Sequence, residues 1–161
     1  MELQNSNIVV KQLVGKYNPQ KTFSENKTVK RVLSDNFKKQ VLNGAKIING
    51  LPRMSFSKYQ FTETIYDKEM MEHFKISKSY GLMTREEILY VIDILTNKQP
   101  NGEEGILQIN GNKTIIGYIL CDDGVIRVVR VYWISDDFKW RCICSDLIGW
   151  GAGWEVLSRN L

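Results

Sequence analysis

Two turn signals rich in aspartate divide residues 113–145 into three apolar runs. The turns are residues 121–124 (CDDG) and 135–137 (SDD), and Asp and Gly favour tight reversals of the chain. Apolar runs separated by such short turns are typical of antiparallel strands in up-and-down order. We therefore expect a three-stranded meander, the segment that most constrains the fold of this chain.

The predicted turn tips decide which side chains share each face of the meander. With residues 123–124 and 136–137 as tips, Trp133 lies opposite Trp140 on a bulky apolar face, which we expect to be the core. The same register turns Cys121 to the other face, away from Cys142 and Cys144. No disulfide is then expected, and we interpret all three cysteines as small buried hydrophobic residues.

The second face of the meander combines cations with an aromatic ring. The predicted register places Arg130 opposite Gly117 and Arg141 opposite Tyr132. Such a surface can bind phosphates or stack bases. The alternative is that the arginine stems cover the edge of a packed face while their charged ends reach water.

Helical patterns occur in three other segments. The clearest is residues 84–97, where Thr84 and Glu87 form a capping box and Met83 and Ile88 a hydrophobic staple; residues 64–74 form a weaker helical pattern. A third helix is expected over Thr28–Asn43, with its apolar residues at helical spacing. That helix would present a stripe of basic side chains opposite its apolar face, formed by Lys27, Arg31 and Lys38.

These elements predict one domain of the α+β class spanning residues 1–161. We expect a curved antiparallel meander of four to six strands, either an open sheet or a partial barrel, with two or three packed α-helices. The first seven residues lack the basic and apolar segments of a secretory signal, and no apolar run is long enough to span a membrane. We expect a cytoplasmic protein that does not bind membranes.

Charge is unevenly distributed along the sequence. Residues 1–60 contain eleven Lys or Arg against three acids, whereas residues 61–161 contain eleven against fifteen. Such an uneven distribution of charge is found in proteins that bind nucleic acid or acidic proteins. It is also found in proteins whose charged residues are simply solvated at the surface.

Few side chains are available for catalysis or cofactor binding. His73 is the only histidine, which excludes a site with two histidine ligands in one chain. The paired aspartates at 122–123 and 136–137 lie at opposite ends of one predicted strand, too far apart to form one site. Their presence is explained by the preference of Asp for tight turns. No nucleotide-binding or hydrolase motif is present. We therefore expect no cofactor, no metal and no catalytic residue.

The segment Gly149–Trp154 contains three glycines and two large aromatic residues, Trp150 and Trp154. One interpretation is that these tryptophans close the end of the core before a last short strand. The other is that they are exposed and bind a partner.

The sequence thus favours a small binding protein without enzymatic activity, whose partner is nucleic acid or an anionic protein surface. The candidate basic contacts are Lys27, Arg31, Lys38, Arg130 and Arg141. The alternative is a protein-interaction or inhibitor module that uses the aromatic residues Tyr132, Trp150 and Trp154. A hydrolase is a weaker alternative, because no two carboxylates are predicted to share a pocket.

Overall fold

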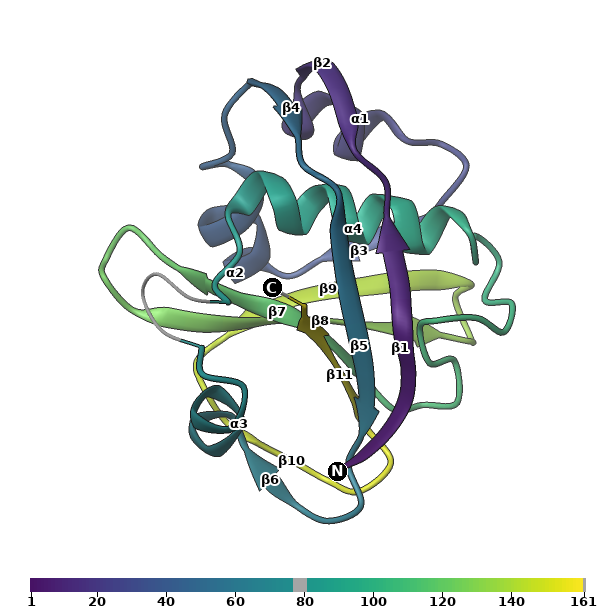
Figure 1. The fold of residues 1–161 in the computed structure, drawn as a ribbon. Helices are drawn as coiled ribbons and strands as arrows, with labels where there is room; N and C mark the ends of the chain where they lie inside the picture. The colour runs from purple at the N-terminus through teal and green to yellow at the C-terminus, as the bar shows by residue number, and fades with distance from the viewer. Residues whose placement is uncertain (77–80, 161) are drawn as a thin grey trace.

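A seven-stranded sheet forms the centre of the computed structural model, which describes residues 1–76 and 81–160 (Figure 1). The spatial order of the strands is β1-β5-β11-β7-β8-β9-β3, so the sheet is open, with β1 and β3 at its edges. In chain order the strands are β1 (Glu2–Val10), β3 (Arg31–Leu33), β5 (Met54–Gln60), β7 (Thr114–Leu120), β8 (Ile126–Ile134), β9 (Lys139–Ser145) and β11 (Glu155–Arg159).

The sheet is mixed, which corrects the prediction of a purely antiparallel one. The meander itself is present as β7, β8 and β9, with both of its pairings antiparallel. Two further pairings are parallel, β11 with β7 and β3 with β9. The α+β class is confirmed, but the sheet has more strands than the sequence predicts and does not close into a barrel.

Helix α4 (Arg85–Asn97) packs across one face of the sheet and forms the main core with it (Figure 1). The predicted capping box is confirmed: the Thr84 side chain accepts a hydrogen bond from the Glu87 amide, and the Glu87 carboxylate accepts one from the Thr84 amide. Trp133 and Trp140 lie opposite each other, as predicted, with their ring centroids 5.2 Å apart. The buried Trp140 indole donates a hydrogen bond to the carbonyl of Gln99, just after α4.

The opposite face of the sheet is partly covered by a smaller layer. This layer contains α3 (Asp67–His73) and a two-stranded sheet formed by β6 (Ile65–Tyr66) and β10 (Gly149–Trp150). A second apolar cluster, which includes Met70, Tyr118 and Trp150, fills the space between this layer and the large sheet. In Figure 1 these elements lie below the sheet and α4 lies above it.

The predicted helix over Thr28–Asn43 is wrong in its first half. Residues 31–33 form β3, and helical structure begins with α2 (Asp35–Phe37), which continues into the π-helical turn η1 (Lys38–Leu42). Ser34 is the helix N-cap, with its side chain accepting a hydrogen bond from the Phe37 amide. The apolar residues of this short edge strand stand at positions that also fit a helix, so the apolar spacing was ambiguous.

The turn between β7 and β8 is one residue longer than predicted. Leu120 pairs with Ile126, and Gly124 has a φ of +79°, the left-handed conformation that ends a three-residue hairpin loop. A second irregularity in β7 leaves Arg130 opposite Ile115 instead of Gly117. Because a shift of one residue exchanges the faces of a strand, Cys121 lies on the same face as Cys142 and Cys144, contrary to the prediction.

All three cysteines are free and buried, which confirms their interpretation as core residues. Burial raises the pKa of Cys142 and of Cys144 to about 12. We therefore predict that a thiol reagent such as Ellman's reagent modifies none of the three in the folded protein at pH 8 and all three in denaturant. Stoichiometric labelling without denaturant would contradict this arrangement.

The remaining elements lie at the periphery. They are α1 (Pro19–Glu25) and a second small sheet of β2 (Leu13–Tyr17) and β4 (Ile48–Leu51). Residues 105–109, which resemble a short strand in sequence, form none. Among the described residues, no helix has the length and apolar character needed to cross a membrane.

Candidate functional site

Four residues, each in one of four neighbouring strands or directly before it, form a continuous row on the face of the sheet opposite α4. Tyr132 of β8 pairs with Arg141 of β9, as predicted. Trp154 and Lys113 immediately precede the first paired residues of β11 and β7, so they extend the row on the other side of Tyr132. In spatial order the aromatic–cation row is Trp154, Lys113, Tyr132 and Arg141, all half-buried.

The ammonium group of Lys113 lies between the two aromatic rings of this row. Its Nζ is 5.0 Å from the ring centroid of Tyr132 and 5.2 Å from that of Trp154. Both distances are within the range of attraction between a cation and an aromatic ring. The rings therefore hold the cation at the surface of the sheet.

Arg130 lies beside the row, one step along β8 on the same face of the sheet. It pairs with Ile143, so it is the diagonal neighbour of Arg141. Its guanidinium lies over the Trp150 ring, 4.7 Å from the centroid, and the residue is only 9% exposed. The Trp150 and Trp154 rings are 4.5 Å apart, which connects Arg130 to the row.

The three cations of this face lack a paired carboxylate. In the part of the chain that the structure describes, no acidic side chain forms an ion pair with Lys113, Arg130 or Arg141. Burial, together with the positive charges of Arg130 and Arg141, lowers the pKa of Lys113. The electrostatics of the face therefore favour an anion.

Asp67 is an acidic group whose charge acts on Arg130, and its oxygens already accept hydrogen bonds. Oδ1 accepts hydrogen bonds from the Tyr118 hydroxyl at 2.7 Å and from the Trp150 indole at 2.8 Å, and Oδ2 accepts one from the Ile148 amide at 2.7 Å. Burial raises the pKa of this carboxyl, although the three hydrogen bonds and the charge of Arg130 oppose the shift. Asp67 thus joins α3 to the sheet and holds Trp150 in place.

The predicted aromatic contacts divide into one interior and two surface residues. Trp150 is 1% exposed, which matches the interpretation of a ring that closes the core. Trp154 and Tyr132 are half-exposed and lie in the row. Lys113 was missed in the sequence, because the predicted register places it opposite Ile134; the longer turn and the irregularity in β7 bring it level with Tyr132.

The residues of the predicted basic stripe do not form a stripe. Lys27 is exposed in the loop before β3, and Lys38 is exposed on η1. Arg31 points inward from β3, where its Nη2 lies 2.7 Å from Asp93 Oδ1 of α4 and its guanidinium lies over the Phe23 ring. Arg31 and Lys38 line an open hollow of about 520 Å³ between α1, β3 and η1.

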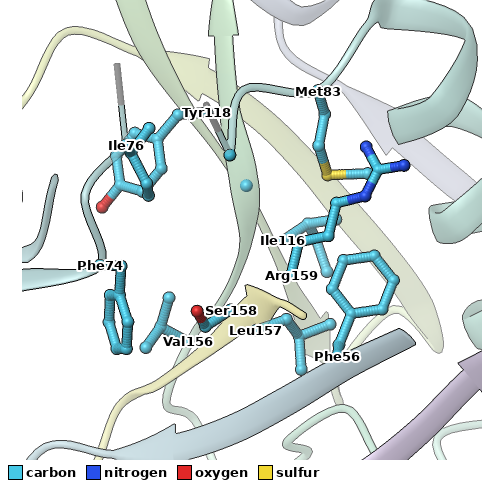
Figure 2. A pocket seen from close by; sticks show the side chains of 12 residues that line it. Phe56, Phe74, Ile76, Met83, Ile116, Tyr118, Val156, Leu157, Ser158 and Arg159 are labelled. Atoms are coloured by element: carbon cyan, nitrogen blue, oxygen red, sulfur yellow. The ribbon is translucent and has the colours of Figure 1, made fainter. Parts of the chain in front are cut away.

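A small cavity lies between β7, β11 and the segments that flank residues 77–80 (Figure 2). Its volume is about 20 Å³, room for a single water molecule. Most of the side chains around it are apolar, among them Phe56, Phe74 and Met83, with Arg159 at one side (Figure 2). This cavity is a packing defect, too small for an organic ligand.

Side chains that could hold a metal ion do not cluster in residues 1–76 and 81–160, where no group of three or more His, Cys, Asp or Glu is found. The arrangement that remains is the aromatic–cation row with Arg130 beside it, which can bind an anion next to a planar ring. Comparisons of the chain with models of protein families, with curated proteins and with solved structures gave no match.

Proposed function

We propose that this protein is a non-catalytic binding protein that takes single-stranded nucleic acid along the aromatic–cation row. The main support is the alternation of two aromatic rings with two cations that no described carboxylate neutralises. Sites for single strands combine cations that follow the phosphate backbone with aromatic rings that contact bases. An open sheet surface is one of the frameworks on which proteins build such sites.

The dimensions of the row suit a short stretch of such a strand. Neighbouring strands of a sheet are about 4.8 Å apart, so the four residues span about 14 Å. Lys113 and Arg141 lie two strands apart, with Tyr132 between them. A phosphate backbone that crosses the strands of the sheet would meet a cation at both positions and a ring in the middle.

A protein partner bound through the aromatic residues is the alternative. Such a ligand would depend on Trp154 as an apolar contact and would show little salt dependence. The alternation of rings and cations favours nucleic acid, since a partner of this kind requires the rings alone.

The test is a fluorescence-anisotropy titration with a labelled single-stranded RNA at about 50 and 200 mM salt. Replacing both Lys113 and Arg141 by Gln is expected to weaken binding about tenfold or more at the lower salt. It should also reduce the slope of log K against log salt by about 1.4, because each phosphate contact on a single strand contributes about 0.7.

A matched control removes two positive charges from exposed lysines that lie outside the aromatic–cation row. The double variant Lys27→Gln, Lys38→Gln should bind RNA with an affinity close to that of the unmodified protein. Weaker binding by this control, with the Lys113 and Arg141 variant unaffected, would assign the site to the hollow near β3. Absence of RNA binding at the lower salt would exclude nucleic acid and direct the search to a protein partner that contacts Trp154.

A further inference from the structure

The guanidinium of Arg130 has polar atoms that the fold leaves without partners. Its Nε and Nη1 are buried, and neither has a hydrogen-bond acceptor among the described residues. The Nε of Arg141, its diagonal neighbour, is in the same condition. A buried donor without an acceptor is costly, and a bound ion is one of the few explanations for its presence in a folded protein.

The arrangement around Arg130 identifies the kind of acceptor that is missing. Asp67 does not supply it: its oxygens accept hydrogen bonds from Tyr118, Trp150 and Ile148, and the Arg130 guanidinium lies over the Trp150 ring instead. Arg130, Arg141 and Lys113 are close enough for both arginines to lower the pKa of the lysine. Three neighbouring cations that form no ion pair with a described carboxylate favour an anion with more than one negative charge.

We infer that Arg130, with Lys113 and Arg141, forms a phosphate subsite at one side of the aromatic–cation row and that this subsite takes the terminal phosphate of a bound strand. Arginine binds phosphate through parallel N–H donors, and such charge-assisted pairs are short and strong. A terminal phosphate projects from the strand and has two negative charges near neutral pH. It can therefore approach the guanidinium of Arg130, a residue only 9% exposed, more closely than an internal phosphodiester, which is flanked by two sugars.

This inference rests on the proposed function, and the experiment separates the two. A short single-stranded RNA is compared with the same RNA carrying a 5′-phosphate and with the same RNA carrying a 3′-phosphate. One phosphorylated form should bind at least about tenfold more tightly than the unphosphorylated RNA, as expected for added hydrogen bonds to a charged group. Arg130→Gln should abolish this preference, so that the variant binds the three RNAs with equal affinity.

Arg127 provides a matched control on the same strand. It is already paired with Asp123 and Asp146, so Arg127→Gln removes the same charge without touching the subsite. This variant should keep the full preference for the phosphorylated strand. If Arg130→Gln fails to fold, Arg130→Lys keeps the charge without the paired donors and should still reduce the preference.

Different results overturn different statements. Equal affinity for all three RNAs would refute the subsite and leave the proposed function intact. Inorganic phosphate that raises the melting temperature through Arg130, without RNA binding, would refute the proposed function and the strand-end assignment while it identifies the subsite as one for a small free anion. Preference retained by Arg130→Gln would refute the role of Arg130.

Discussion

Replacing Asp67 by Ala is expected to lower the free energy of unfolding by about 3–5 kcal/mol. Three donors would lose their acceptor in the protein interior: the Tyr118 hydroxyl, the Trp150 indole and the Ile148 amide. Each unsatisfied buried donor costs about 1–3 kcal/mol, and partial relaxation reduces the sum. Urea unfolding followed by tryptophan fluorescence measures the loss directly.

Asp67→Asn is the matched control, because it keeps the side-chain shape and one oxygen acceptor. Its loss should be smaller, about 1–2 kcal/mol, since only the acceptor for the Ile148 amide is replaced by a donor. Equal stability of Asp67→Ala and the unmodified protein would show that this carboxylate does not hold α3 and β10 on the sheet.

The ionisation of Asp67 adds a pH dependence of defined sign. Burial raises the pKa of this carboxyl in the folded state, so the folded protein binds this proton more tightly than the unfolded chain. Protonation of Asp67 therefore stabilises the folded state. This stabilisation is fully present at pH values below the pKa of Asp67 in the unfolded chain, and it is lost as the pH rises through the higher pKa of Asp67 in the folded protein. The unfolding free energy of the unmodified protein should increase relative to that of Asp67→Asn when the pH is lowered from 7 toward 4.

Replacing Asp93 by Ala is expected to cost a similar 3–5 kcal/mol. The Arg31 and Asp93 side chains are only 4% and 11% exposed, and removing one partner leaves the other as an unpaired buried charge. Asn26 would also lose its hydrogen bond to the carboxylate. The same urea titration should show this loss, whereas Lys27→Ala and Lys38→Ala should change stability by less than about 0.5 kcal/mol, as exposed residues do.

A double-mutant cycle separates the ion pair from the packing around it. Arg31→Met combined with Asp93→Ala removes both charges and keeps most of the apolar stem, so part of the stability lost in Asp93→Ala should return. Additive losses in the double variant would instead show that the two charges do not interact. This cycle also tests the placement of Arg31, because a surface arginine on a basic helix would show no coupling to Asp93.

The sequence predicts best those features that local chemistry decides. The capping box at Thr84 is a local hydrogen-bond pattern, and the meander follows from turns rich in Asp and Gly. The register of β7 was mispredicted because the loop ending at Gly124 can contain two or three residues, and one glycine fits both. The strand β3 was mistaken for helix because its partner, β9, lies more than a hundred residues away; Ser34 and Asp35 were the local sign of the true helix start.

The candidate site was predicted in part. Arg130, Arg141 and Tyr132 were identified from the alternation of β8 and β9. Their union with Lys113 depends on the irregular register of β7 with β8, and that with Trp154 on the parallel pairing of β11 with β7, which no local pattern reveals. Charge counts were misleading, since the cations of the aromatic–cation row lie in the more acidic part of the sequence. The excess of Lys and Arg in residues 1–60 is dispersed over several elements instead.

The position of β11 has a consequence for the order of folding. This strand follows all others of the large sheet in sequence, yet it lies between β5 and β7 and separates the β1-β5 pair from the meander. The meander forms through local contacts, which form quickly, whereas the pairing of β1 with β5 closes the longer loop of residues 11–53. Their union must wait for the strand synthesised after both, so until it arrives a nascent chain displays two unpaired inner edges to the crowded environment of the cell.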